Sequence, residues 1–454
     1  MGKKYDFDYI IIGSGPAGCT AALSLATPKK KIALIESGKF GGCNLNTRDV
    51  PYSISLDFSH TFSQIANYPE ISRHDLHYIF PTVVAHQNYI ISNIANIDAQ
   101  SIKNANITFI HSHAEFLDPH TIIVKEDKKL TAANFIIATG ASPNLGGIQG
   151  TDTARYFTPY NIIKAKRLPK FILVVGGGAS GCEIAEYFAE LGSKVVILER
   201  EDRLLPREDK EAGAALAEYF TRHLGIVVVT HANVTALEQD DTSEKVIFKI
   251  GNEEKTLRID HVILATGSTP NTNCGLEKAG VKYDDNGIKV NRMFQTTARN
   301  IYAIGDCIGG ESSTERSEYQ ASVLSANLSG KTKSIASYTG FIRTVNTHPE
   351  VAIVGYNKVD LAKMKKRCRK AIVYIKDITA SKIHRIDYGF IKILADHSGH
   401  IIGATIVAPN AGLMAEEFAI AIRHNLTVLE LASTPHISNS FNYAIKLAAK
   451  QLVK

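Results

Sequence analysis

Paired cysteines are the first feature that this sequence lacks. Its six cysteines lie far apart, and none of them forms a CxxC or CxxxxC pair or joins a histidine cluster; they are Cys19, Cys43, Cys182, Cys274, Cys307 and Cys368. With no secretory signal in the sequence, this spacing argues against a disulfide framework and predicts reduced thiols. It also offers no pattern for a zinc site, so we predict no bound metal.

Long hydrophobic runs are missing as well. The apolar run 9–12 is broken at once by glycines, which fits neither a signal peptide nor a membrane span, and we expect a cytoplasmic protein. The net charge of +6 would suit anionic small molecules as well as nucleic acid. The densest basic run, 363–370, contains no aromatic residue. We interpret it as a solvated helix end or loop and expect no nucleic-acid partner.

The first pattern with chemical meaning is an apolar strand that runs into a glycine turn, Asp8-Tyr-Ile-Ile-Ile-Gly13-Ser-Gly15-Pro-Ala-Gly18. In a G-x-G-x-x-G turn the first glycine permits the tight turn, the second lets the backbone approach a pyrophosphate, and the third lets the helix pack on the strand. The pyrophosphate then lies at the N-terminus of the helix. Glu36 ends the next apolar strand and is placed to hold a ribose hydroxyl.

The same pattern occurs a second time, in the stretch Phe171-Ile-Leu-Val-Val-Gly176-Gly-Gly178-Ala-Ser-Gly181, and its second strand ends in Glu199. In both copies the acid stands 23 positions after the first glycine. An α/β protein with glycine turns and no nucleotide is the alternative, but it must explain two complete patterns. Two copies therefore predict two bound dinucleotides.

Shorter strands follow each copy. Two of them end in Thr-Gly, at Thr139-Gly140 and Thr266-Gly267, and each is followed by a Pro-Asn pair. A later strand, Ile301-Tyr-Ala-Ile, delivers Asp306 to its C-terminal end. Because ligands bind outside the carboxyl ends of strands in open α/β sheets, Asp306 is a candidate ligand-binding residue.

These motifs resemble those of the pyridine nucleotide-disulfide oxidoreductases, the flavoproteins that include lipoamide dehydrogenase, glutathione reductase and mercuric reductase. The resemblance covers essentially the whole chain. It implies an α/β fold with two Rossmann-like dinucleotide-binding domains, for FAD and NAD(P), and a C-terminal α+β dimerisation domain. The implied bounds are 1–150 with 271–335 for FAD, 151–270 for NAD(P) and 336–454 for dimerisation. A homodimer is therefore expected.

The resemblance also implies cofactor-binding residues. For FAD they are Gly13, Gly15, Gly18, Glu36, Gly41, Gly42, Thr139, Gly140 and Asp306; for NAD(P) they are Gly176, Gly178, Gly181 and Glu199. Glu183 matches the family's acidic residue beside the nicotinamide. Glu199 favours NADH, because a carboxylate about 4 Å from a 2′-phosphate costs about 4 kcal/mol at a dielectric of about 20. Arg200 and Arg203 could return a similar amount, so NADPH stays open.

The chain departs from the family where the redox-active disulfide should be. The family segment Gly-Gly-Thr-Cys-Leu-Asn-Val-Gly-Cys-Ile-Pro-Ser-Lys aligns without a gap to Gly41-Gly42-Cys43-Asn44-Leu45-Asn46-Thr47-Arg48-Asp49-Val50-Pro51-Tyr52-Ser53. Both cysteine positions are thus occupied by Asn44 and Asp49. The family's C-terminal His-Glu base pair is also missing, because Thr434 and Asn439 stand in its place. We interpret His436, which lies between them, as a polar interface residue.

Losing both halves of the dithiol chemistry makes disulfide reduction implausible, but hydride transfer between bound cofactors needs mainly positioning. We predict an FAD-dependent NAD(P)H oxidoreductase that passes electrons to a diffusible small-molecule acceptor such as a quinone, a metal ion or oxygen. Glu183, Asp49 and Cys43 are the candidate catalytic residues. Two alternatives stay open: a single-cysteine redox enzyme that uses Cys43, and a non-catalytic flavin-binding dimer.

Overall fold

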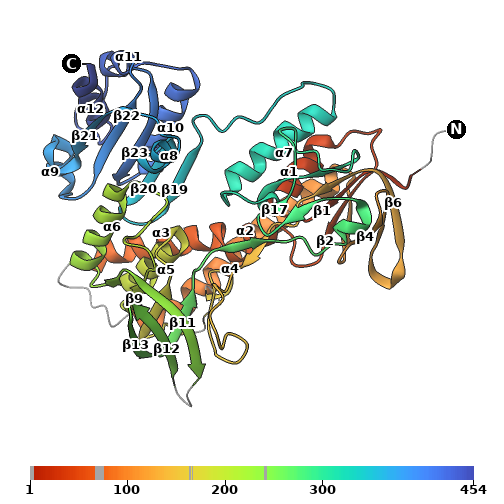
Figure 1. Ribbon diagram of the computed structural model, residues 1–454, viewed down its shortest axis with the longest axis horizontal. Helices are drawn as coiled ribbons and strands as arrows, with labels where there is room; N and C mark the ends of the chain where they lie inside the picture. Colours follow the sequence, from red (N-terminus) through yellow and green to blue (C-terminus); the bar gives the residue numbers. More distant parts are fainter. Residues whose placement is uncertain (1–4, 67–75, 163–164, 166, 240–242, 454) are drawn as a thin grey trace. The chain divides into compact units, whose positions relative to one another are not determined.

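The computed structural model describes residues 5–66, 76–162, 165, 167–239 and 243–453, which form two compact units (Figure 1). Unit 1 draws on residues 1–54, 82–144 and 267–337, and unit 2 draws on residues 55–81, 145–266 and 338–454. Two boundaries between the units fall inside helices, in α3 (Asp49–Ala66) and α4 (Leu76–Asn104). Each unit is therefore assembled from stretches that are distant in the sequence.

A largely parallel sheet organises unit 1, with the strand order β3-β2-β1-β6-β5-β4 and with β18 also paired to β6. The parallel strands are β1 (Phe7–Ile12), β2 (Ile32–Glu36), β3 (Thr108–His111), β6 (Lys129–Ile137) and β18 (Ile301–Ala303). The short strands β5 (Thr121–Ile123) and β4 (Glu115–Asp118) continue antiparallel from the first half of β6. The inner strands β1, β2 and β6 are mainly apolar where both faces of the sheet are covered.

Small residues let the helices of unit 1 pack closely on this sheet. Helix α1 (Pro16–Leu25) carries Ala17, Ala21 and Ala22 on its buried face and packs against α7 (Thr314–Leu328). The other elements of unit 1 are short: α2 (Gly42–Thr47), the pair β7 (Ala141–Pro143) and β15 (Ser268–Pro270), the hairpin β16 (Tyr283–Asp284) and β17 (Gly287–Ile288), and the 3-10 helices η2 (Lys125–Asp127), η4 (Leu276–Ala279) and η5 (Gly305–Ile308).

Unit 2 contains a second strand-turn-helix-strand of the same kind, in a parallel sheet with the order β10-β9-β8-β14. Its strands are β8 (Phe171–Val175), β9 (Lys194–Leu198), β10 (Val227–Val229) and β14 (His261–Leu264), and its helices are α5 (Ala179–Glu190) and α6 (Lys210–His223). A three-stranded antiparallel sheet adjoins it, formed by β11 (Ala232–Gln239), β12 (Glu244–Ile250) and β13 (Glu253–Ile259).

The C-terminal part of unit 2 is an antiparallel sheet with the order β19-β20-β23-β22-β21. These strands are β19 (Ile342–Val345), β20 (Glu350–Gly355), β21 (Arg369–Tyr374), β22 (Phe390–Ala395) and β23 (Ile401–Ala408). Helices α10 (Ala411–Arg423) and α12 (Tyr443–Val453) bury one face of this sheet in a shared apolar core. The smaller helices are α8 (Lys358–Lys363), α9 (Thr379–His384), α11 (Val428–Ser433) and η6 (Ile375–Asp377).

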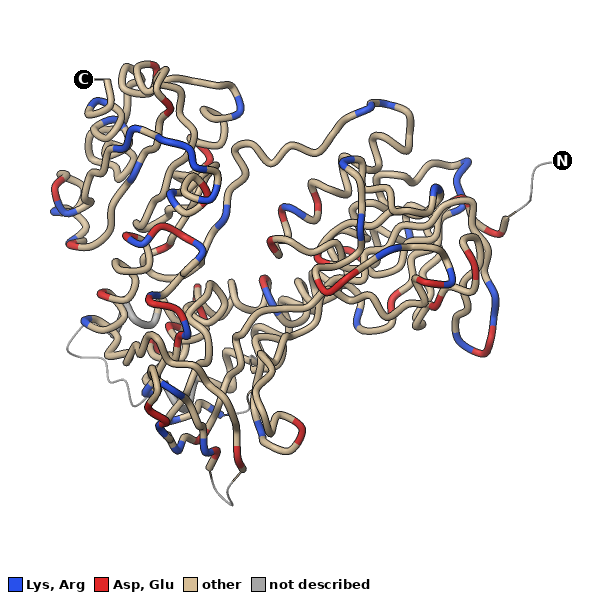
Figure 2. The backbone as a smooth tube through the Cα atoms, in the orientation of Figure 1, with Lys and Arg blue, Asp and Glu red and all other residues tan. Residues whose placement is uncertain are grey.

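This architecture confirms the predicted fold class of two Rossmann-type nucleotide-binding parts and a C-terminal α+β part. Nearly all of the predicted segments 151–270 and 336–454 falls within unit 2, a grouping that the sequence did not reveal, whereas 267–270 and 336–337 belong to unit 1. The basic run 363–370 forms the end of α8 and the loop into β21, as expected, and is drawn almost continuously blue in Figure 2. In the described part of the chain no helix is long and apolar enough to cross a membrane.

A buried ion network joins the C-terminal sheet of unit 2 to the nucleotide-binding part of the same unit. The ammonium of Lys392, on β22, lies 2.7 Å from a carboxylate oxygen of Asp209 and 2.9 Å from one of Glu211. Thr405 donates a hydrogen bond of 2.6 Å to Asp209 from the neighbouring strand β23. The side chains of Lys392 and Asp209 are fully buried. Breaking such a pair leaves one charge buried without its counterion.

We therefore expect Lys392→Met to lower the free energy of unfolding by about 3 to 5 kcal/mol, because Asp209 would stay buried without its cation. Urea denaturation followed by circular dichroism measures this change. Lys370→Met is the matched control, since the Lys370 ammonium is half-exposed and lies 4.0 Å from Glu211; it should change stability by less than about 1 kcal/mol. Equal effects of the two substitutions would show that the network does not stabilise unit 2.

Candidate functional site

Two glycines of the first turn are required by the fold itself. Gly13 has a φ of +110°, and a β-carbon there would lie 2.2 Å from the carbonyl oxygen of Ala138. A β-carbon at Gly18 would lie 1.9 Å from the carbonyl oxygen of Gly13. No side chain fits at such distances, so both positions hold helix α1 close to strands β1 and β6.

Gly15 differs from its neighbours, because a β-carbon there would meet no described atom within 4 Å. Gly15 is the N-cap of α1, and among the described residues no side chain caps that helix end. The first backbone N–H groups of α1 therefore face open space, where the positive end of the helix dipole favours an anion. A β-carbon at Gly42 would lie 2.9 Å from the Cα of Gly15, so the Gly41-Gly42 pair borders the same space. This cradle fits a dinucleotide pyrophosphate.

Glu36 is tied to the glycine turn through Ser14. One carboxylate oxygen of Glu36 accepts hydrogen bonds from the backbone N–H and the hydroxyl of Ser14, both at 2.8 Å, and the other accepts from the N–H of Gly38 at 2.7 Å. The Ser14 hydroxyl in turn accepts a hydrogen bond of 3.1 Å from the N–H of Gly41. The structure thus gathers Gly15, Glu36, Gly41 and Gly42 around one turn, as the sequence predicted.

Thr139 and Gly140 serve the pairing of β7 with β15. The Thr139 hydroxyl donates to the carbonyl of Asn271 at 2.8 Å, and the Asn271 amide donates to the carbonyl of Thr139 at 2.9 Å. The N–H of Asn271 also donates to the carbonyl of Gly140 at 2.9 Å. The Thr139 hydroxyl is therefore engaged within the fold, which the sequence did not indicate.

Asp306 opens the 3-10 helix after β18, as the sequence predicted for the C-terminal end of that strand. One of its carboxylate oxygens lies 3.6 Å from a guanidinium nitrogen of Arg48. Burial raises the pKa of Asp306, while a hydrogen bond from Ser312 and the charge of Arg48 offset part of that rise.

The two positions that hold cysteines in related chains contact each other here without sulfur. The Asn44 amide donates a hydrogen bond of 3.0 Å to the Asp49 carboxylate. Thr314, at the start of α7, hydrogen-bonds to both side chains. Polar contacts therefore occupy the place of the disulfide, and Thr314 is a member of the site that no sequence motif indicated.

Cys43 adjoins this cluster but is not activated. The residue is exposed, yet burial around its sulfur raises the pKa of the thiol, and the Thr47 hydroxyl and the Arg48 charge offset only part of that rise. Since the thiolate is the nucleophilic form, a raised pKa makes Cys43 a poor nucleophile at neutral pH. All six cysteines, which lie in the described part of the chain, are free thiols.

The second glycine turn repeats the geometry of the first. A β-carbon at Gly176 would lie 2.5 Å from the carbonyl oxygen of Ala265, and one at Gly181 would lie 2.0 Å from the carbonyl oxygen of Gly176. Gly178, the N-cap of α5, has no described atom within 4 Å of such a β-carbon and no capping side chain from the described residues. This turn therefore presents a second open helix N-terminus that fits a pyrophosphate.

Glu199 is fixed in the same way as Glu36. It is buried, and its two oxygens accept hydrogen bonds from the N–H groups of Gly177 at 2.5 Å and Glu201 at 2.7 Å. The two arginines that could have favoured a 2′-phosphate are paired locally. Arg200 lies 3.4 Å from Glu201, and Arg203 lies 2.7 Å from Asp202.

Glu183 lies on α5 one turn beyond the second glycine turn, where the resemblance places it. It is almost fully buried, and its carboxylate accepts a hydrogen bond of 2.8 Å from the backbone N–H of Asn346. The segment between β19 and β20 thus fixes the orientation of the Glu183 side chain within unit 2.

His436 has a carboxylate partner that the sequence motif did not indicate. A His-carboxylate pair exists after all, because a ring nitrogen of His436 lies 2.8 Å from a carboxylate oxygen of Glu417 on α10. The other ring nitrogen contacts the carbonyl of Thr434 at 2.9 Å. The imidazole is therefore oriented by an acid, as a catalytic base would be. Sequence reasoning missed this pair because Glu417 lies on α10, outside the C-terminal motif, whereas His436 lies in the loop after α11.

Comparisons with known proteins agree with this arrangement. The family model of the pyridine nucleotide-disulphide oxidoreductases matches residues 7–326, and the model of that family's dimerisation domain matches residues 342–449. Mercuric reductase of Bacillus cereus is 28% identical over 437 residues, which cover 95% of this chain and 69% of that protein. Dihydrolipoyl dehydrogenase of Bacillus subtilis is 27% identical over 442 residues, which cover 94% of this chain and 93% of that protein.

Solved structures share the fold. LpdA from Mycobacterium tuberculosis superposes with a TM-score of 0.86 at 25% identity, over 98% of this chain and 99% of that chain. The HOCl-induced flavoprotein disulfide reductase RclA from Escherichia coli superposes with a TM-score of 0.87 at 23% identity, over 98% of this chain and 99% of that chain. With both family models matched in sequence order, the chain belongs to the pyridine nucleotide-disulphide oxidoreductase family.

Proposed function

We propose that this protein oxidises NAD(P)H through a bound FAD and passes the electrons to a diffusible acceptor instead of a disulfide. Its family consists of flavin-dependent pyridine nucleotide oxidoreductases. The acceptor class that we propose is a quinone, a metal ion or oxygen. The two cofactors supply the redox chemistry when bound, and the chain supplies their positions.

The observation that supports this proposal is the hydrogen bond between Asn44 and Asp49, closed by Thr314. A dithiol relay needs two sulfurs that can form a bond and a thiolate that can attack. Neither side chain has sulfur, and the neighbouring Cys43 has a raised pKa. The site can therefore hold charge and hydrogen bonds but cannot exchange disulfides.

The same observations weigh against the two alternatives. A single-cysteine enzyme needs a thiolate at Cys43, whereas burial raises the pKa of that thiol. A non-catalytic protein needs no open cradle at the second glycine turn, yet Gly178 leaves that helix end free of side chains from the described residues. We propose that Glu183 positions the nicotinamide and that Asp49 sets the charge near the flavin.

We propose NADH as the preferred donor. The Glu199 carboxylate is held in place by two backbone N–H groups, so it cannot move aside for a 2′-phosphate without losing both hydrogen bonds. Arg200 and Arg203 are already paired with neighbouring acids. These neighbouring acids reduce the positive charge that either arginine could offer to a 2′-phosphate.

We also propose that the protein acts as a homodimer, as expected from the match to the dimerisation domain. Large apolar side chains are exposed on α10, on α11 and in the loop after it; they are Leu413, Ile420, Leu429 and Ile437, between 61% and 77% exposed. Exposed apolar residues that gather on neighbouring elements mark an interaction surface. His436 and its partner Glu417 border the same surface.

The two open helix ends give a reciprocal test of the cofactor sites. Gly15→Val should leave unit 1 folded, because its β-carbon meets no described atom, but the protein should lose at least nine-tenths of its FAD. Gly178→Val should keep FAD and raise the KM for NADH at least tenfold. Flavin absorbance and steady-state kinetics measure both effects. Normal FAD in Gly15→Val, or an unchanged KM in Gly178→Val, would refute the corresponding assignment.

The preference for NADH over NADPH should shift when Glu199 is replaced by the isosteric glutamine. Glu199→Gln removes the negative charge but keeps the size of the side chain, so the ratio of kcat/KM for NADPH over NADH should rise about tenfold or more. Glu218→Gln, which alters an exposed acid on α6 that pairs with Arg222, is the control and should leave the ratio within about twofold. A ratio unaffected by Glu199→Gln would assign selection to another residue.

The number of NADH equivalents that reduce each flavin tests whether the protein lacks a redox-active disulfide. An anaerobic titration should end at one equivalent of NADH per flavin and show no long-wavelength absorbance from a thiolate beside the flavin. Oxidised lipoamide and glutathione disulfide should not be reduced, whereas ferricyanide and quinones should be. Uptake of a second equivalent would reveal a hidden disulfide and contradict the proposal.

The double variant Asn44→Cys with Asp49→Cys provides the positive control for that titration. The two side chains already touch, so the introduced sulfurs should form a disulfide and raise the capacity to two equivalents of NADH. Each single variant should stay at one equivalent.

A further inference from the structure

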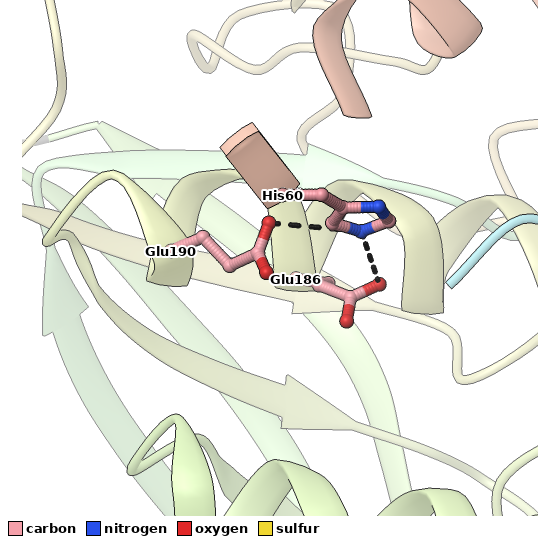
Figure 3. Close-up of side chains that lie close together, drawn as sticks. All are labelled: His60, Glu186 and Glu190. Atoms are coloured by element: carbon pink, nitrogen blue, oxygen red, sulfur yellow. Dashed lines mark ion pairs between the residues drawn. The ribbon is translucent and has the colours of Figure 1, made fainter. Parts of the chain in front are cut away.

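A histidine and two glutamates from distant parts of unit 2 face one another on the second half of α5 (Figure 3). The Nε2 atom of His60, on α3, lies 3.8 Å from a carboxylate oxygen of Glu186 and 3.7 Å from one of Glu190. Both glutamates belong to α5, and their spacing of four residues places them on one face of that helix. One donor atom from each side chain lies within 4.8 Å of the other two.

The two glutamates are almost completely shielded from solvent. The side chains of Glu186 and Glu190 are 0% and 1% exposed. Two carboxylates held together at low dielectric repel each other, and each is costly to ionise without a cation.

The imidazole of His60 does not satisfy the cluster by itself. Its Nε2 atom is buried and has no hydrogen-bond partner among the described residues. Distances of 3.7 and 3.8 Å to the carboxylates are too long for hydrogen bonds, which require about 2.7 to 3.2 Å. The Nε2 atom of His60 thus faces both carboxylates without a hydrogen bond to either.

Other groups hold the carboxylates in this orientation. The N–H of His348 donates to both oxygens of Glu186 at 2.8 Å, and the hydroxyl of Ser59 donates to Glu190 at 2.5 Å. In metal sites, the ligand side chains are commonly held in orientation by hydrogen bonds of this kind from surrounding groups. The His348 ring adds no charge, because burial and the nearby His60 lower its pKa to about 4 and its Nε2 contacts the hydroxyl of Tyr388 at 2.9 Å.

We propose that His60, Glu186 and Glu190 bind one divalent transition-metal cation with the ligand preference of Zn²⁺. One imidazole nitrogen and two carboxylate oxygens are ligands that Zn²⁺ accepts, and three protein ligands leave one position for water. Ligand atoms around a tetrahedral Zn²⁺ at about 2.0 to 2.1 Å lie about 3.3 Å apart. The distances from His60 exceed this by about half an ångström, a gap that small side-chain rotations would close.

The cation would tie α3 to α5 within unit 2. Helix α5 begins at Gly178, and its Glu183 precedes Glu186 by one turn. The site therefore supports the helix that carries the second nucleotide-binding turn. This inference is independent of the electron acceptor and of the donor preference proposed above.

Metal titration of the full-length FAD-loaded protein tests the site. After treatment with EDTA and removal of the chelator, isothermal titration calorimetry with Zn²⁺ should show one equivalent bound per chain. His60→Gln and Glu190→Gln should each weaken that binding at least tenfold, with FAD content unchanged as the check of folding. His400→Gln is the matched control, because His400 pairs with a single surface carboxylate, Asp396, at 3.3 Å. It should leave the affinity unchanged.

X-ray absorption at the zinc edge keeps the inference testable if a variant fails to fold. The wild-type protein with one equivalent of Zn²⁺ should show only nitrogen and oxygen ligands, at about 2.0 to 2.1 Å. A sulfur ligand at about 2.3 Å would place the ion on a cysteine and overturn the proposal. Failure of the wild-type protein to bind Zn²⁺, or binding that survives both His60→Gln and Glu190→Gln, would overturn it as well.

Discussion

In each nucleotide-binding turn, the close approach of a helix glycine to a backbone carbonyl oxygen determines how the helix packs on the strand. At Gly18 and Gly181 the helix approaches the strand so closely that a β-carbon would overlap the carbonyl of Gly13 or Gly176. That approach aims the N-terminus of α1 or α5 at the open space in front of the turn. The acids at the ends of β2 and β9 then bond back to the same turns. The shape of both turns thus depends on backbone packing before it depends on any polar side chain.

Sequence alone predicted this part because the constraint is local. A strand, a glycine turn, a helix and a terminal acid follow one another within a short stretch, so their spacing records their contacts. The gapless register from Gly41 to Ser53 likewise predicted that Asn44 and Asp49 would take the places of the disulfide, and the structure brings these two side chains into contact.

Contacts between distant elements could not be predicted in the same way. Glu417 reaches His436 from another helix, Thr314 closes the Asn44 and Asp49 pair from α7, and His60 meets Glu186 from α3. Each of these partners is set by tertiary packing, which leaves no spacing pattern in the sequence. The grouping of the second nucleotide-binding part with the C-terminal sheet depends on the buried Lys392 and Asp209, residues that would be expected on the surface from their type alone.

Strand β18 carries a consequence for how the chain folds during synthesis. It pairs with the end of β6, yet the whole segment 145–266 of unit 2 lies between them in the sequence. While the ribosome makes that segment, the last three residues of β6 lack this partner, and an open strand edge is a site for pairing with other chains. Folding of unit 2 likewise cannot be completed before residues 338–454 have been synthesised. Neither unit is complete until late in translation, and this order favours slow, chaperone-dependent folding.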